Sequence, residues 1–120
     1  MGHDFSAMAG KTVTGITGCR VGSEDMEITF SDRTACRMWH QEDCCESIRI
    51  EEIHGDPSDF IGREIVSAEA SEVYTPATAD GDQTDTFYKL ACANGYLTIR
   101  WLGESNGYSG TAVAVDWSKP

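Results

Sequence analysis

The sequence predicts a mainly β, single-domain protein (α+β in the broad sense): a strongly curved antiparallel sheet or a small barrel of seven to eight strands with one short helix. Three observations predict this class. The 120 residues suffice for one domain with one core. Apolar side chains recur mainly with period two, which is typical of half-buried strands. Turn residues separate these segments without the strand–helix–strand rhythm of a parallel sheet.

The expected strands follow one another at short intervals. The alternation of apolar and polar residues predicts them at residues 12–17, 26–30, 35–40, 47–51, 65–74, 86–93, 96–102 and 112–117. A short polar turn joins the second strand to the third in a hairpin. Asn94-Gly95 predicts another hairpin with a type I′ turn, because both central residues of that turn require positive φ. We expect residues 1–9 to be a flexible N-terminal segment and residues 10–120 to form the domain.

One short helix and one mobile loop complete the expected elements. Asp56 can cap the helix, Pro57 suits its first position, and Gly62 can end it. Residues 75–85 contain one proline, one glycine and three aspartates but no basic residue. We therefore expect this stretch to be a mobile loop and the first site of proteolytic cleavage.

The net charge of −11 limits the partners that the protein can attract. Twenty acids stand against nine bases, which argues against binding to nucleic acid or to an anionic membrane. No apolar run has the ~18 residues of a membrane helix, and residues 1–10 do not form a secretion signal. A protein with a basic surface, or a cation, is the expected attractant.

The five cysteines indicate reduced thiols rather than a disulfide framework, because their number is odd and two are adjacent. His40, Cys44, Cys45 and His54 are weak candidates for zinc ligands. If Cys36 to His40 is a strand, however, these two residues lie ~13 Å apart, and both could not bind the same zinc ion without a bend in the strand. We expect neither a metal nor a cofactor. Catalysis by a Cys44 or Cys45 thiolate with a histidine base is disfavoured, because the neighbouring acids raise a thiol pKa.

A second group of candidate binding residues follows the strand at 96–102. Glu104, Ser105, Asn106 and Tyr108 are expected on an exposed loop, with Arg100 in the strand before it. Such a loop can offer a carboxylate, a hydroxyl, an amide and an aromatic ring to a partner. The alternative is a plain hairpin connection in which glycines supply the special backbone conformations.

A third feature is a cluster of acids within 18 residues. It consists of Glu42, Asp43, Glu46, Glu51, Glu52, Asp56 and Asp59. Such acids form either a solvated face or a surface that imitates a phosphate backbone and occupies the basic groove of another protein. The sequence carries no EF-hand calcium loop, no Walker glycine loop and no dinucleotide fingerprint.

Three segments carry two unusual motifs: residues 39–47 (WHQEDCCES), 87–90 (FYKL) and 98–109 (TIRWLGESNGYS). They resemble the segments Y/W-H-x-x-D-C-C-E-S and F-Y-K-L…T-I-R-W-x-G-x-S-N-G-Y-Y-S of a family of small uncharacterised proteins from tailed phages and prophages. The resemblance covers about residues 10–117, and Ser109 departs from it where a second tyrosine is common. The family is a domain of unknown function, so no catalytic role is implied, and the implied location is the cytoplasm of a bacterial host.

The leading hypothesis is a non-enzymatic, acidic phage accessory protein that binds and interferes with a bacterial host or defence protein. Its partner would have a basic surface and would contact Glu42, Asp43, Glu46, Glu51 and Glu52. The first alternative is a protein that binds a small ligand, such as a nucleotide signal, through Arg100, Ser105, Asn106 and Tyr108. The second alternative is a zinc-binding protein.

Overall fold

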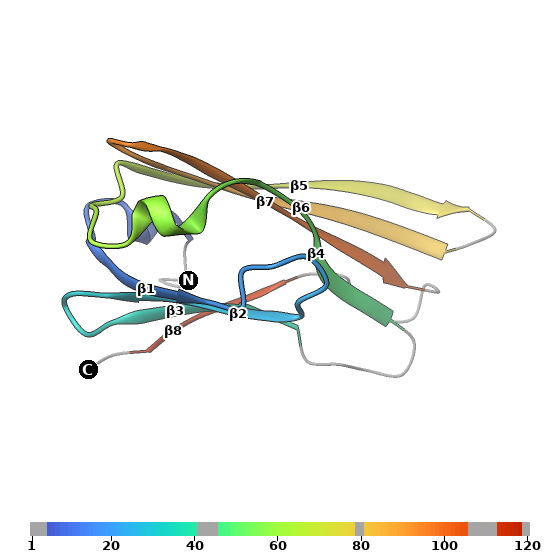
Figure 1. Cartoon of the computed structure of the whole chain (residues 1–120). Coiled ribbons are helices and arrows are strands. Elements are labelled where there is room, and N and C mark those ends of the chain that lie inside the picture. The colour runs from blue at the N-terminus through green and yellow to red at the C-terminus, as the bar shows by residue number, and fades with distance from the viewer. Residues whose placement is uncertain (1–4, 41–45, 79–80, 106–112, 119–120) are drawn as a thin grey trace.

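Eight strands form two antiparallel sheets that lie one over the other (Figure 1). The computed structural model describes residues 5–40, 46–78, 81–105 and 113–118. The first sheet has the order β1-β2-β3-β8 and consists of β1 (Val13–Thr17), β2 (Asp25–Phe30), β3 (Ala35–Trp39) and β8 (Ala114–Ser118). The second has the order β4-β7-β6-β5 and consists of β4 (Glu46–Gly55), β7 (Gly95–Ser105), β6 (Gly81–Cys92) and β5 (Ser67–Thr78).

The predicted class, mainly β and antiparallel, is confirmed, but neither a single curved sheet nor a small barrel forms. β8 occupies the edge of β3, so β4 cannot continue the first sheet along that edge and pairs with β7 instead. Each sheet has one apolar face, and stacking the two faces buries both of them. The described strands therefore bury their apolar faces between two sheets, and no closed barrel is needed.

The core lies between the two sheets and follows the predicted alternation. The buried side chains of the first sheet include Met26, Ile28, Phe30, Cys36 and Met38. Those of the second sheet include Ile48, Ile50, Tyr88, Leu90, Leu97, Ile99 and Trp101. All of them belong to one continuous cluster. The side chains between them along each strand point outward, so the second sheet presents a largely polar face to solvent, which also carries the exposed Tyr96 and the half-buried Phe87 and Leu102.

Backbone hydrogen bonds join the two sheets along the side where β1 and β4 lie. The Gly22 amide donates to the Ile50 carbonyl at 2.8 Å, and the Ile50 amide donates to Ser23 at 2.8 Å. At the other end of β1, the Val13 amide donates to Arg63 at 2.9 Å. The loop after β1 thus covers the outer edge of β4 at Ile50. On the opposite side of the molecule, β5 and β8 form the edges of the two sheets.

The N-terminal segment, predicted to be flexible and outside the domain, packs against the core at residues 5–8. Residues Phe5–Met8 form a 3-10 helix, η1, in which Phe5 and Met8 are buried. The Phe5 ring lies 4.5 Å from the Tyr88 ring, centroid to centroid. Because Phe5 supplies apolar area that β5 lacks, the helix completes the core beneath the start of that strand.

The expected short helix is confirmed as a single 3-10 turn, η2 (Pro57–Phe60). The Asp56 carboxylate accepts hydrogen bonds from the Ser58 amide at 3.0 Å and from its hydroxyl at 2.8 Å. These bonds lower the pKa of Asp56, since they favour its charged form. Phe60 is fully buried and fixes the turn to the core. No helix in the described part of the chain is long and apolar enough to cross a membrane.

The prediction of a mobile loop at residues 75–85 is wrong for the residues that the structure describes. β5 continues to Thr78 and β6 begins at Gly81, so this stretch is the distal part of a long hairpin (Figure 1). The side chains of residues 71–75 are exposed on both faces of β5. In β6 the inward position of this stretch is held by Thr84, a polar residue that is only 7% exposed, so the sequence shows no apolar alternation at residues 83–85.

The hairpin predicted at Asn94-Gly95 forms between β6 and β7, but its turn is placed differently. Cys92 pairs with Gly95, so the two turn residues are Ala93 and Asn94, and Gly95 already belongs to β7. Neither Asn94 nor Gly95 has positive φ. The type I′ turn is therefore incorrect, although the hairpin itself is confirmed.

Candidate functional site

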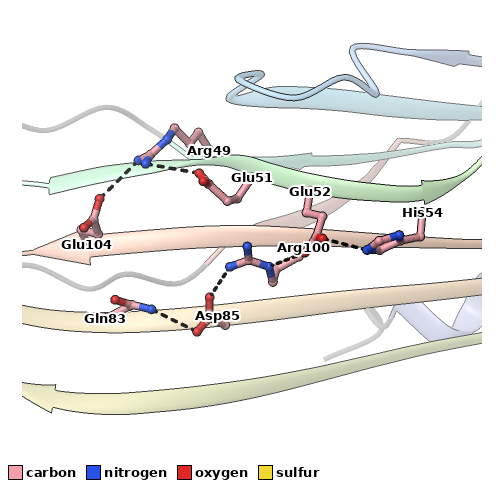
Figure 2. Close-up of polar contacts among 8 residues, drawn as sticks. All are labelled: Arg49, Glu51, Glu52, His54, Gln83, Asp85, Arg100 and Glu104. Atoms are coloured by element: carbon pink, nitrogen blue, oxygen red, sulfur yellow. Dashed lines mark hydrogen bonds and ion pairs between the residues drawn. The ribbon is translucent and has the colours of Figure 1, made fainter.

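The outward face of the second sheet gathers charged side chains from three neighbouring strands. Figure 2 shows them together with the neutral Gln83, and we call this set of eight residues the charged face: Arg49, Glu51, Glu52, His54, Gln83, Asp85, Arg100 and Glu104. They stand on β4, β6 and β7, between the inward-facing residues of the core. The alternation of the strands thus creates both the core and this surface.

Arg100 is the centre of the charged face, because it bridges the strands on both sides of β7. Its Nε donates to Glu52 Oε1 on β4 at 3.1 Å, and its Nη1 donates to Asp85 Oδ1 on β6 at 3.0 Å. The side chain of Arg100 is 26% exposed, and that of Asp85 is 17% exposed. Two charge-assisted contacts hold the guanidinium in one orientation, and Gln83 Nε2 donates to the second oxygen of Asp85 at 3.2 Å.

A second arginine repeats this arrangement at the edge of the sheet. Arg49 Nη2 lies 3.3 Å from Glu51 Oε1, and Arg49 Nη1 lies 3.4 Å from Glu104 Oε1. The register of β4 shifts between Ile50 and Glu52, which marks a β-bulge with Glu51 as the extra residue. The bulge places Glu51 and Glu52 on the same outward face, whereas strict alternation would turn Glu52 toward the core.

His54 adds a further contact to Glu52. Its Nε2 lies 2.9 Å from Glu52 Oε2. The hydrogen bonds from Arg100 and, after it, from His54 lower the pKa of Glu52, because both stabilise the carboxylate. Glu52 is therefore the carboxylate on which the strongest polar contacts of β4 and β7 converge.

We predict that Glu52→Gln destabilises the fold at neutral pH, and that this loss becomes smaller as the pH falls below the unfolded-state pKa of the carboxyl group. A carboxyl group whose pKa is lowered by folding stabilises the folded state at pH values above its pKa in the unfolded state, which is about 4.3. This contribution is lost as the pH falls through the lower, folded-state pKa. Urea denaturation at pH 7 and at pH 3 measures the difference, with Glu64→Gln as the control at an exposed acid. An equal loss of stability at both pH values would show that ion pairing is not the cause.

The structure brings together some of the residues singled out in the sequence. Glu51, Glu52, Arg100 and Glu104 meet on the charged face. Glu104 lies in β7, not in the loop that was expected to present it. The backbones of Glu46 and Ser105 pair between β4 and β7. The remaining candidate residues lie outside the described residues: Glu42, Asp43, Cys44, Cys45, Asn106 and Tyr108.

The four weak zinc candidates do not form a described metal site. His40 follows β3 in the first sheet, whereas His54 projects from β4 and contacts Glu52. Cys44 and Cys45 lie outside the described residues. Within residues 5–40, 46–78, 81–105 and 113–118, no three His, Cys, Asp or Glu side chains are grouped as metal ligands.

Two thiols that pack in or against the core, the buried Cys36 and the half-buried Cys19, are unsuited to act as nucleophiles. Burial raises the pKa of Cys19 to about 11. Burial, and after it the charges of Asp116 and Glu27, raises the pKa of Cys36 to about 12. Because the thiolate is the reactive form, both cysteines behave as small apolar core residues.

Sequence reasoning missed three members of the charged face: Arg49, Gln83 and Asp85. Arg49 stands between Ile48 and Ile50, and that outward position was the available signal. Gln83 and Asp85 fell in the segment interpreted as a loop. The length of the hairpin between β6 and β7 would have been a better signal. Because β7 runs to Ser105 and pairs with β6 along its whole length, β6 has to begin near residue 82.

The first sheet also carries a paired arginine on its outward face. The Arg37 guanidinium contacts the Asp25 carboxylate and lies 4.1 Å from the centre of the Trp39 ring. Trp39 Nε1 donates to Asp116 Oδ2 at 2.6 Å. Cross-strand contacts of this kind fix side chains on a sheet surface.

Comparison with known families gives one match. The model of a domain of unknown function, DUF7448, matches residues 6–115, which is nearly the whole chain and includes all strands except most of β8. Searches among curated proteins and among solved structures give no match. The match spans well over half of the sequence, and the chain therefore belongs to the DUF7448 family, a domain of unknown function.

Proposed function

We propose that this chain is a non-enzymatic protein-binding domain whose charged face binds a basic surface of another protein. The observation that carries the proposal is the balance of charge on that face. Four carboxylates, those of Glu51, Glu52, Asp85 and Glu104, surround only two guanidinium groups. The face is therefore negative overall, although each arginine is paired. A basic partner would be attracted to it and oriented on it.

The fixed geometry of the face supports a protein partner. Arg49 and Arg100 hold their acids in place before any partner arrives, so binding need not order long flexible side chains. The strands beneath are tied together by the same contacts, which keeps the surface rigid. A preorganised surface that is negative overall, on one face of a sheet, suits the broad contact area of a protein.

The small-ligand alternative is less well supported by the same contacts. That hypothesis requires Arg100 to be available to an anionic group of the ligand. Arg100 is already held by Glu52 and Asp85, at 3.1 and 3.0 Å. A nucleotide phosphate would have to displace one carboxylate and approach the other, which costs electrostatic energy. The resemblance to phage proteins makes a host bacterial protein the partner that we propose.

The proposal is tested by reversing charge on the face without disturbing the core. We expect the double variant Glu51→Lys, Glu104→Lys to bind a captured bacterial partner with an association rate constant about tenfold lower at low salt. Both changed side chains form ion pairs with Arg49, and Ile48 and Ile50 on the core side are unchanged. Circular dichroism checks the fold, and surface plasmon resonance gives the rates.

The matched control is Glu64→Lys together with Glu24→Lys, which changes the net charge equally at exposed sites off the charged face. If the control slows association as much as the double variant, the net charge of the protein and not the charged face governs binding. If capture is abolished only by Asn106→Ala with Tyr108→Ala, and is unaffected by both charge variants, the proposal is wrong and the small-ligand alternative gains support.

A further inference from the structure

We propose that the open edge of β5 binds an extended, basic segment of a partner protein by strand addition. This surface lies on the side of the second sheet where the loop after β1 does not cover the edge. It is separate from the charged face, and the proposal holds whether or not that face binds a protein. Four observations support the proposal: the edge of β5 is unpaired among the described strands, apolar side chains are exposed on it, hollows lie beside it, and acidic residues line these hollows.

β5 is a long strand at the end of its sheet. It pairs with β6 on one side, and no described strand pairs with its other side. The start of the strand lies against η1, while residues 71–75 are exposed. An exposed strand edge presents backbone amides and carbonyls that an incoming strand can pair. Pro76 lacks an amide hydrogen, so the usable edge ends before it.

Two apolar side chains remain exposed along this edge. Val73 is 54% exposed and Tyr74 is 59% exposed, and as neighbours in a strand they point to opposite faces. At a sheet edge that faces only water, exposed apolar groups of this size are a liability. An added strand would cover part of both side chains and would satisfy the backbone groups between them.

A hollow of about 460 Å³ opens between β5 and β8, on the inner side of the edge. Phe5, Tyr88, Val113 and Val115 form its apolar walls, and Glu72 and Thr86 also line it. A second hollow of about 400 Å³ shares Phe5 with the first and follows the start of β5. Together they provide space for side chains of a strand that pairs with β5, because alternate side chains of that strand would point between the sheets.

The charge of these hollows indicates a basic occupant. Glu72 lines the first and Glu69 the second, and among the described residues no Lys, Arg or His lines either one. Neither acid has an ion pair among the described side chains. Thr86 is only 3% exposed, and its hydroxyl has no hydrogen-bond partner in the described part of the chain. A lysine could place its apolar stem against Phe5 and Tyr88 and its ammonium near Glu72.

The same charges disfavour a second copy of this chain as the occupant. Antiparallel pairing of β5 with itself would join two strands that each carry Glu69 and Glu72, with no base on either strand between residues 67 and 78. Like charges opposite one another destabilise strand pairs. A heterologous strand with lysines at alternate positions and β-branched residues between them fits both the edge and the hollows.

The test uses a synthetic seven-residue peptide that alternates threonine or valine with lysine, and a matched peptide with glutamate in place of lysine. Binding to the full chain is followed by NMR titration of the backbone amides. We expect the lysine peptide to shift the amides of residues 71–75 and the glutamate peptide to shift none. Glu72→Lys is expected to weaken binding at least tenfold. Glu27→Lys, an equal change on the outward side of the other sheet, should leave the affinity within about twofold.

The outcomes separate this proposal from the previous one. Binding of the lysine peptide that survives Glu51→Lys with Glu104→Lys but not Glu72→Lys supports the β5 edge. Shifts confined to the charged face, or equal losses in the Glu72→Lys and Glu27→Lys variants, would refute strand addition at β5. Dimerisation of the unliganded chain with amide protection at residues 71–75, lost on dilution, would make a second copy the occupant and would also refute it.

Discussion

Replacing Trp101 by alanine is expected to lower the free energy of unfolding by about 3–5 kcal/mol. Trp101 is completely buried at the centre of the second sheet, where it pairs with Ile50 on β4 and Thr86 on β6. Truncation removes the largest apolar side chain between the sheets and leaves a cavity that three rigid strands cannot fill. Urea denaturation followed by circular dichroism measures the loss. A loss below about 1 kcal/mol would show that the two sheets do not pack through this residue.

Replacing Trp101 by phenylalanine separates packing from hydrogen bonding at the same site. The indole Nε1 is buried and has no hydrogen-bond partner among the described residues. Phenylalanine removes this N–H, which relieves an unfavourable burial and offsets part of the cavity cost. We expect a loss of less than about 2 kcal/mol. A loss as large as that of the alanine variant would indicate that the N–H has a partner in the folded protein.

Replacing Gly55 by alanine is expected to destabilise the protein by about 3 kcal/mol. Gly55 ends β4 with φ of 107°, a conformation that side chains rarely adopt. A Cβ atom there would lie 2.2 Å from the Tyr96 carbonyl oxygen and 3.1 Å from the Leu97 Cα. Both obstacles are backbone atoms of the paired strand, so β4 and β7 would have to separate. Thermal and urea unfolding measure the effect.

Gly62→Ala is the matched control for that variant. Gly62 has φ of 79°, but a Cβ atom there would meet no heavy atom within 4 Å. Its substitution therefore adds backbone strain without a clash, and we expect a cost of about 1–2 kcal/mol. If the two variants lose the same stability, the close approach of Gly55 to β7 contributes nothing and the strand register there is in error.

The alternation of apolar and polar residues correctly predicted the strands that have one face in the core and the other face in solvent. Met26, Ile28 and Phe30 on β2 face the core as their spacing indicated, and so do Val115 and Trp117 on β8 in part. Local chemistry predicted the turn at Asp56-Pro57, where the cap and the proline act within a few residues. These features depend only on residues that are close together in the sequence, and they can therefore be predicted from one sequence.

The arrangement into two sheets could not be predicted in the same way. The pairing of β3 with β8 joins segments nearly 80 residues apart, and nothing in either segment specifies its partner. The charged face also depends on non-local register. Arg100 meets Asp85 only because β6 pairs with β7 over its whole length, and Glu52 faces outward only because of the bulge at Glu51. A bulge shifts a strand by one residue and leaves no clear mark in the sequence.

The most direct test of the proposed function is the salt dependence of binding between the chain and a bacterial protein captured by it. Ionic screening shortens the reach of surface charges from about 10 Å at 0.1 M salt to about 3 Å at 1 M. If the charged face binds a basic surface, the association rate constant should fall at least tenfold between 50 and 500 mM salt, and less steeply for the Glu51→Lys, Glu104→Lys variant. Equal association rates at both salt concentrations would contradict the proposal that the acids of this face carry the interaction.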